Sequence, residues 1–260
     1  PSGANLLLRR LRQRHPADLH RLGALTVYET TPGFARDRAE WDLKRRHGIV
    51  AEELTGEQAR EREPALGPLV RHAIATPQWA HVSDPAEITR RLLQWLTARG
   101  VAVRRGEAIG AEGRSLRLAD GGAVPFDTLV VAAGAWSGRL ARAIGDRALL
   151  ESERGYNTTL PSSAFEVKRQ LIFGGHGFVV TPLSTGLRVG GAVELGGLKR
   201  PPNFARSRAM LEKAKFPVVL HGKCQFPQKF DASLDLIARA FHETPATNVA
   251  VHSIPPRSYP

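Results

Sequence analysis

The clearest hydrophobic pattern in the chain lies in residues 83–100, SDPAEITRRLLQWLTARG. Beginning with Ile88, apolar residues recur at helical spacing and therefore fall on one face. Asp84 is placed to cap the first turn, and Pro85 suits the first helical position. Gly100 suits a left-handed cap at the end. The segment therefore predicts an amphipathic helix.

After this helix the pattern predicts several strands and one more helix. VAVRR (101–105) is short and β-branched, and RSLRL (114–118) alternates apolar with polar residues. DGG (120–122) is a hairpin-type turn. TLVVA (128–132) is an unbroken apolar run, typical of a strand buried on both faces, and a helix is expected over 137–144. This order of elements predicts part of a doubly wound α/β layer.

Strand patterns also lie on both sides of this α/β segment. The expected strands are 24–29, 70–77, 155–160, 177–183 and 186–195. The last two are joined by Ser184, Thr185 and Gly186, which predicts an antiparallel hairpin. Polar helices are expected at 35–47, 55–62 and 203–215. These elements predict a second, mainly antiparallel layer.

The two layers and a C-terminal tail divide the chain into four consecutive parts. The combination of the two layers predicts an α/β (α+β) fold class. Residues 1–80 and 151–215 are assigned to the antiparallel layer, and residues 81–150 to the α/β layer. Residues 216–260 have scattered prolines and no clear period, and only 234–241 suggests a helix there. The α/β layer is therefore interleaved in sequence with the antiparallel one.

Composition narrows the class of protein. Apolar residues make up 42% and charged residues 24%, close to the average for a globular chain, so disorder throughout is not expected. No run approaches the ~18 apolar residues that predict a membrane-spanning helix. A single cysteine, Cys224, excludes an intramolecular disulfide framework. The chain begins with Pro1 rather than Met, which suggests the interior of a longer protein.

The net charge of +12 is spread along the chain instead of forming one block. Nucleic-acid-binding modules have recognisable signatures, such as aromatic RNP-like segments or zinc-finger spacing, and neither is present. We therefore expect mainly solvated arginines on helix faces and no nucleic-acid partner. Attraction for anionic lipid, acidic partners or anionic substrates is the alternative.

Several catalytic classes lack their motifs. GAWSG (134–138) superficially suggests a nucleophile elbow, but Ser137 is its fourth residue and G-x-S-x-G needs serine third. Ser137 is better placed to cap the next helix. The nine histidines are scattered without H-E-x-x-H, and a phosphate loop of the G-x-x-x-x-G-K-[ST] type is missing. We expect no metal site and no hydrolase.

The turn after the expected strand 128–132 has small side chains. Ala133 and Gly134 would let the backbone approach a ligand, and Trp136 could cover an apolar ring face. An ordinary tight turn between strand and helix explains the same residues equally well. This stretch alone leaves both interpretations open.

Four segments of the chain, taken together, resemble one known family. They are WAHVSDPAEITRRLLQWLTARGVAVRRG (79–106), FDTLVVAAGAWSGRLARAIG (126–145), ESERGYNTTLP (151–161) and GFVVTPLSTGLRVGGAVELGG (177–197). They look like the D-amino-acid dehydrogenase branch of the FAD-dependent amine oxidoreductases, a family that includes glycine oxidase and D-amino-acid oxidase. The similarity extends from about residue 5 to about residue 215, in the family's order and spacing.

The resemblance implies a fold, a cofactor and a reaction. The fold would be a partial Rossmann-type FAD domain interleaved with a mainly antiparallel substrate domain. The reaction would be oxidative deamination of D-amino acids by hydride transfer to flavin, giving a 2-oxo acid and ammonia. Electrons would pass to a quinone or another acceptor. A cytoplasmic location follows by analogy, with at most peripheral contact with the inner face of the cell membrane.

The resemblance also implies cofactor-binding positions. Ile109 matches a position whose backbone meets the adenine side of FAD. Ala132, Ala133, Gly134 and Trp136 match the family's small-residue turn beside the cofactor.

The implied substrate-binding positions are Tyr156, His176, Phe178 and Arg188. His176 and Phe178 match the strand that faces the flavin, Tyr156 the RGY strand and Arg188 the GLRV strand. For Tyr156, Phe178 and Arg188 the alternative is ordinary sheet packing and a solvated strand charge. The sequence assigns no catalytic residue.

Two parts of the family pattern are missing. G-x-G-x-x-G, which places a pyrophosphate on a helix N-terminus, does not occur, and GGHGF (174–178) has the wrong spacing. After Lys215 the chain has no G-x-R-P segment, whose arginine would hold the substrate carboxylate. We therefore expect a fragment that is weakly active or inactive alone. The alternatives are a non-catalytic flavoprotein subunit completed by another chain, and a basic binding protein.

Overall fold

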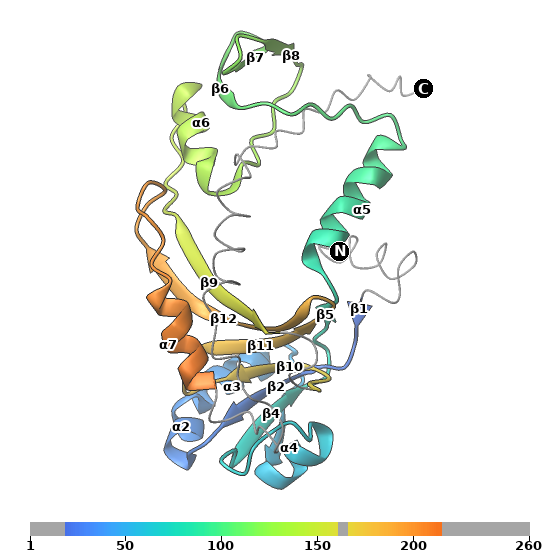
Figure 1. The fold of residues 1–260 in the computed structure, drawn as a ribbon, viewed down its shortest axis with the longest axis vertical. Helices are drawn as coiled ribbons and strands as arrows, with labels where there is room; N and C mark the ends of the chain where they lie inside the picture. The colour runs from blue at the N-terminus through green and yellow to red at the C-terminus, as the bar shows by residue number, and fades with distance from the viewer. Residues whose placement is uncertain (1–18, 161–165, 215–260) are drawn as a thin grey trace. The chain divides into compact units, whose positions relative to one another are not determined.

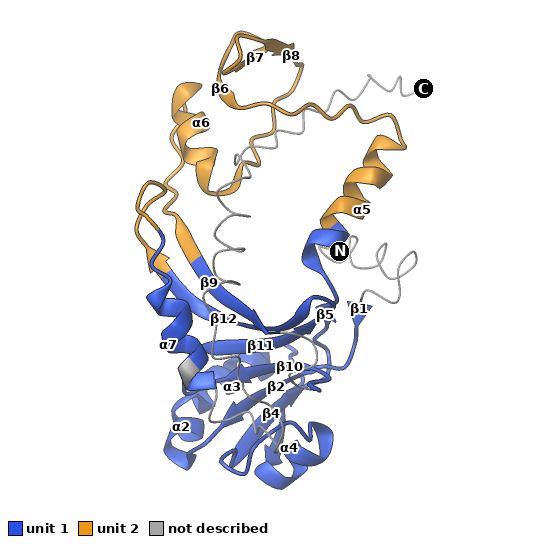
Figure 2. Cartoon of the chain, viewed as in Figure 1, with its two compact units in different colours: residues 1–88, 155–193, 202–230 blue, residues 89–154, 194–201, 231–260 orange. Residues whose placement is uncertain are grey.

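The computed structural model describes residues 19–160 and 166–214, which belong to two compact units (Figure 2). Among the described residues, unit 1 contains those up to Ile88, Gly155–Val193 and those from Pro202 onward. Unit 2 contains Thr89–Arg154 and Glu194–Pro201. The chain thus passes from unit 1 to unit 2 after Ile88 and back after Arg154, whereas the sequence predicted these changes after residues 80 and 150. It enters unit 2 once more over Glu194–Pro201, a change that the sequence did not predict. The predicted tail over 216–260 and its helix at 234–241 lie outside the described residues.

Unit 1 is built on a seven-stranded sheet with the order β3-β4-β2-β10-β11-β12-β9 (Figure 1). The strands are β2 (Ala24–Tyr28), β3 (Glu52–Thr55), β4 (His72–Thr76), β9 (Glu153–Leu160), β10 (Gln170–Phe173), β11 (Phe178–Leu183) and β12 (Gly186–Leu195). β10 pairs with β2 in parallel, whereas β3–β4, β4–β2, β10–β11 and β11–β12 are antiparallel. This confirms the predicted strands and the hairpin at Ser184.

The helices of unit 1 are short and carry local start signals. They are α2 (Thr31–Arg36), α3 (Arg38–Arg46), α4 (Gly56–Arg62) and α7 (Ala205–Ala214). α4 begins with a capping box in which the Thr55 hydroxyl and the Gln58 side chain satisfy each other's backbone N–H groups. The helix predicted at 35–47 is divided in two at Asp37.

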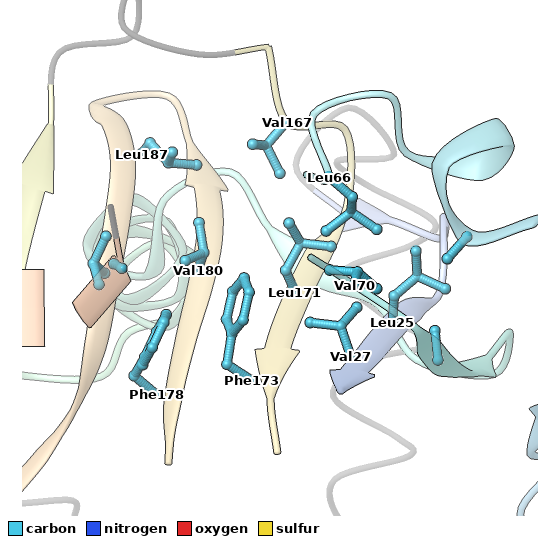
Figure 3. Packing of buried hydrophobic residues seen from close by; sticks show 14 of the residues in the cluster. Leu25, Val27, Leu66, Val70, Val167, Leu171, Phe173, Phe178, Val180 and Leu187 are labelled. Carbon is cyan, nitrogen blue, oxygen red and sulfur yellow. The ribbon is translucent and has the colours of Figure 1, made fainter. Parts of the chain in front are cut away.

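One face of the sheet forms the main core of unit 1. It is lined by alternate residues of the central strands, including Leu25, Leu171, Phe173, Phe178 and Val180 (Figure 3). Alternation places every second side chain on the same face. The covering side chains come from α4, the loop that follows it and α7; they include Ala59, Leu66, Val70, Met210 and Leu211. Phe173 and Phe178 stack with ring centroids 4.5 Å apart.

A smaller cluster lies on the opposite face of the sheet. It contains Tyr28, Trp41 and Ile74, so α3 covers this face over β2 and β4. The Trp41 indole N–H donates to the Tyr28 hydroxyl at 2.8 Å, and burial raises the pKa of Tyr28 to about 12. A Cβ added to Gly174 would lie 2.5 Å from Tyr28 Cε1, so this ring requires glycine there.

A buried carboxylate links α4 to the start of β10. Glu63 is fully buried, and its Oε2 accepts hydrogen bonds from the backbone N–H groups of Lys168 and Arg169. The Arg169 guanidinium lies 3.6 Å from the same oxygen. Burial raises the pKa of Glu63. The hydrogen bonds and Arg169 favour the charged form and lower the pKa, but the effect of burial is larger. The contact joins segments more than 100 residues apart in sequence.

Two histidines meet on a small ribbon formed by β1 (Leu19–His20) and β5 (His81–Val82). Their rings stack with centroids 4.9 Å apart, and the His20 Nε2 lies 2.7 Å from the Ser83 hydroxyl. His81 Nδ1 is buried without a hydrogen-bond partner among the described residues. Burial, and secondarily His20, lowers the pKa of His81 to about 4.

The described part of unit 2 contains two helices, a 3-10 turn and a three-stranded sheet. The elements are α5 (Pro85–Thr97, which starts in unit 1), β6 (Ala108–Glu112), β7 (Ser115–Leu118), β8 (Ala123–Pro125), the 3-10 turn η2 (Gly134–Trp136) and α6 (Ser137–Ala143). The predicted helices at α5 and α6 are confirmed, as is the DGG turn between β7 and β8. Asp84 caps α5 by accepting from the Ala86 N–H at 2.8 Å.

Two strand predictions in unit 2 are wrong. Residues 101–105 and 128–132 belong to no strand, and Val130 is 77% exposed. A strand buried on both faces needs neighbours in a sheet and covering layers. None of the described strands pairs with residues 128–132. The apolar Val130 is therefore left exposed, and Leu149 and Leu150, which follow α6, are exposed as well.

Ser137 corrects a further detail of the sequence prediction. α6 does begin there, but the Ser137 hydroxyl accepts from the preceding Ala133 N–H at 3.0 Å. It therefore closes the turn before the helix and does not cap the helix. No helix in the described part of the chain is long and apolar enough to cross a membrane.

Candidate functional site

The predicted cofactor-binding residues all lie in unit 2. Ile109 is on β6, where the pairing with β7 shifts register between Ala108 and Gly110. Ile109 therefore has no partner residue in the ladder, as in a β-bulge, and 37% of it is exposed. Its backbone is thus turned out of regular pairing at the position predicted for cofactor contact.

The other four cofactor candidates form one corner. Ala132 and Ala133 lead into η2, where Gly134 has a φ of 54° and Trp136 is 40% exposed. A Cβ added to Gly134 would meet nothing within 4 Å, so its backbone conformation, and not crowding, favours glycine. The corner has small residues, accessible backbone and an exposed indole.

This corner fits the flat ring system of FAD, because Trp136 and the exposed Val130 offer apolar surface beside accessible backbone. It does not account for the phosphates, since the sequence contains no G-x-G-x-x-G loop. The fit is therefore to part of the cofactor. No group of three His, Cys, Asp or Glu residues within the described ranges could hold a metal ion.

Two predicted substrate-binding residues have core positions in unit 1. Phe178 is 1% exposed and belongs to the main core, and Tyr156 is 4% exposed. The Tyr156 hydroxyl accepts from the Asn203 N–H at 2.7 Å, and its ring packs edge-on against Phe204. Both positions fit the alternative interpretation of sheet packing. Phe178 points away from the face of the sheet on which Arg188 lies.

His176 occupies the turn between β10 and β11. Its Nε2 lies 3.2 Å from Glu29 Oε1, so the turn is tied to the end of β2. The ring centroid is 5.9 Å from that of Phe178. His176 is thus paired with a carboxylate that the sequence did not single out.

Arg188 lies on the face opposite the main core. The half-buried residues of β9, β10, β11 and β12 on this side are here called the open face; they are Asn157, Thr159, Gln170, Ile172, Val179, Thr181, Leu183, Arg188 and Gly190. Gln170 Nε2 donates to the Thr181 hydroxyl at 3.1 Å, and Arg188 Nε donates to the Thr159 hydroxyl at 3.4 Å. Thr181 and Arg188 are cross-strand partners, so four polar residues form one row.

Three members of this row were missed from the sequence. Gln170, Thr159 and Thr181 alternate with the core residues Leu171, Leu160 and Val180 along their strands. That alternation was available as a signal, because it assigns Thr159 and Thr181 to the face of Arg188 once the strands are paired. The structure therefore brings Arg188 together with these polar residues and separates it from Tyr156 and Phe178.

Comparison with known proteins adds independent information. Residues 2–216 match the family model DAO, FAD dependent oxidoreductase. A D-amino-acid oxidase from Bradyrhizobium diazoefficiens is 29% identical over 213 residues, which cover 80% of this chain and 50% of that protein. A D-amino acid dehydrogenase from Paramagnetospirillum magneticum is 30% identical over 208 residues, covering 74% of this chain and 48% of that protein.

A solved structure extends the similarity to the fold. Glycine oxidase from Geobacillus kaustophilus superposes with a TM-score of 0.68 at 20% identity, covering 83% of this chain and 60% of that one. The chain spans about half the length of the two curated relatives. The cofactor of the matched family is FAD. Because residues 2–216, most of this chain, match the family model, the chain belongs to the DAO family of FAD-dependent oxidoreductases.

Proposed function

We propose that the chain is part of a flavoenzyme that oxidises D-amino acids to 2-oxo acids and ammonia. The observation that carries this proposal is that the two curated relatives described above are named for D-amino acids and align with 80% and 74% of this chain. We further propose, from the dehydrogenase relative, that electrons leave to a quinone or another acceptor.

The reaction removes a hydride, which is one proton with two electrons, from the α-carbon, and a proton from the amino group. Water then converts the imino acid to the 2-oxo acid and ammonia. FAD, when bound, supplies the acceptor for the hydrogen and electrons. The chain contributes an accessible corner at 132–136 and a polar sheet face bearing Arg188. These residues hold and orient the reactants rather than react themselves.

A second candidate function is a flavoprotein subunit whose site is completed by another polypeptide. It is favoured by the exposure of apolar side chains in unit 2, where Val130 is 77% and Leu149 83% exposed. Burial of these side chains against another polypeptide would remove their apolar surface from water. Uptake of FAD by the purified chain discriminates between the two functions.

The test combines FAD titration with a dye-coupled assay on the purified chain. The enzyme function predicts saturable FAD binding, followed by dye reduction with D-leucine but not with L-leucine. A colourless protein that takes up no added FAD would contradict independent catalysis and favour the subunit. FAD uptake without dye reduction by any D-amino acid would contradict the proposed substrate.

A further inference from the structure

The sheet of unit 1 ends in two different edge strands, β3 on one side and β9 on the other (Figure 1). An edge strand presents a row of unpaired backbone N–H and C=O groups to which a further strand can bind. Proteins prevent such pairing with short edges, charged side chains, prolines, bulges or a covering element. The two edges of this sheet differ in how many of these protections they have.

The edge at β3 is protected by its length and by charge. The strand has four residues, and two of them are exposed glutamates. Glu52 Oε1 lies 2.6 Å from Arg62 Nη2, and Glu53 Oε1 lies 2.9 Å from Arg45 Nη2. Successive side chains of a strand point to opposite faces, so each face of this edge bears an ion pair. A further strand at β3 would have to accommodate both ion pairs.

The edge at β9 lacks these protections. The strand is eight residues long, and its part within unit 1, GYNTTL (155–160), contains no charged residue and no proline. No residue from 155 to 160 has a positive φ, and tyrosine and threonine favour extended strands. Within the described ranges, no strand pairs with the side of β9 that faces away from β12. Strand pairing among the described residues therefore does not close this edge.

The segment that leads into α7 contacts β9 from the core face of the sheet. The Asn203 N–H donates to the Tyr156 hydroxyl at 2.7 Å, and the Phe204 ring packs edge-on against Tyr156. Met210 and Leu211, further along α7, belong to the main core. These contacts fix β9 from a direction perpendicular to the one in which a further strand would add. They therefore hold the strand in place for pairing in the plane of the sheet.

Charge decides which partner fits the edge at β9. The chain has a net charge of +12, which opposes self-association wherever the charge is exposed. Residues 155–160 are uncharged, and Arg154, just before them, lies 3.4 Å from Glu194 of the same chain. A strongly acidic or basic segment would find no opposite charge on residues 155–160. Two copies of this segment bring no like charges into opposition, so an identical strand fits.

We propose that β9 pairs with β9 of a second copy of this chain. A two-fold axis perpendicular to the sheet makes the two strands antiparallel and places both main cores on the same side. One sheet then continues through both copies. Pairing of like edges uses both of them, so the assembly closes at a dimer. The inference depends on unit 1 alone and not on the proposed function.

The register follows from the faces of the strand. Opposite residues of an antiparallel pair share a face, so the axis passes between one residue and its own copy. With Asn157 at the axis, Gly155 opposes Thr159 of the second copy, and the charged Glu153 stays outside the ladder. This register brings Asn157 side chains from the two copies next to each other.

The test is a charge exchange at Asn157, followed by sedimentation equilibrium of the full chain. Wild type should be a dimer. Asn157→Lys and Asn157→Glu each place like charges opposite each other, whereas their equimolar mixture forms a Lys–Glu pair. Each variant alone should therefore have a dimer dissociation constant at least about fivefold higher than the mixture. Both variants are present in the mixture, so its recovery shows that each one folds.

Two results would overturn the proposal. One is a wild type that stays monomeric at every concentration, and the other is a mixture that dimerises no better than either variant alone. Gln94→Lys is the matched control, because it adds the same charge at an exposed position on α5. It should dimerise as wild type does; a loss as large as that of Asn157→Lys would contradict the assignment to β9.

Disulfide cross-linking tests the register. Opposite residues of an antiparallel pair have Cα atoms about 4.5–5.5 Å apart, within the range of about 4.4–6.8 Å that a disulfide spans. Cys224→Ser removes the single cysteine of the chain, and Asn157→Cys in that background should form a covalent dimer on mild oxidation. Thr97→Cys, exposed on α5, is the control and should stay uncrosslinked. Equal cross-linking of the two variants, or none in Asn157→Cys, would contradict the pairing at Asn157.

Discussion

Replacement of His81 should make the protein less sensitive to acid. The pKa of His81 falls from 6.5 to about 4 because the ring is 8% exposed and faces His20. Between these two values the unfolded state binds more protons than the folded state. Stability contributed by the neutral ring is therefore lost as the pH falls from about 6.5 towards about 4.

The size of the effect follows from the two pKa values. Lowering the pH from 7 to 5 should cost about 2 kcal/mol of unfolding free energy through His81 alone. His81→Phe keeps an aromatic ring against His20 but removes the titration. The raised pKa of Glu63 acts in the opposite direction, and it is common to both proteins, so it cancels in their difference.

The assay is urea unfolding at both pH values, followed by tryptophan fluorescence, which includes the buried Trp41 of unit 1. Wild type should lose about 2 kcal/mol more than His81→Phe between pH 7 and pH 5. His47→Gln, at the exposed end of α3, is the control and should behave as wild type. Equal losses in wild type and His81→Phe would refute the reasoning.

Three further substitutions test the packing. Gly174→Ala should destabilise the chain by about 1–3 kcal/mol in urea unfolding, because the new Cβ meets the Tyr28 ring; an unchanged midpoint would contradict that contact. Phe178→Ala should cost about 3–5 kcal/mol and Phe178→Leu clearly less, as expected of a core residue; a loss of ligand affinity without destabilisation would instead restore its predicted substrate role. Val130→Thr should change stability by no more than about 0.5 kcal/mol, since its side chain is exposed, and a larger loss would show that residues 128–132 are buried.

Local signals predicted much of the fold. α5 follows from its helical spacing, with Asp84 and Pro85 at its start, and β11 and β12 follow from alternation around a short turn. The failure at 128–132 has a physical cause. An unbroken apolar run identifies a strand only if other strands and covering layers are present, and those contacts are distant in sequence.

The candidate site was predictable only in part. Resemblance to a family singled out Arg188 and the corner at 132–136, and the structure shows accessible surface at both. Thr159, Thr181 and Gln170 join Arg188 through strand pairing, which the sequence does not specify without a register. Glu29 was missed for the same reason, because its contact with His176 joins two distant segments.

The most direct test of the account is anaerobic mixing of the FAD-loaded chain with D-leucine, followed by its visible absorbance. The account predicts loss of the oxidised flavin bands with D-leucine and none with L-leucine, together with slower loss when the α-hydrogen of D-leucine is replaced by deuterium. A chain that binds FAD but keeps its oxidised spectrum with every D-amino acid would contradict it.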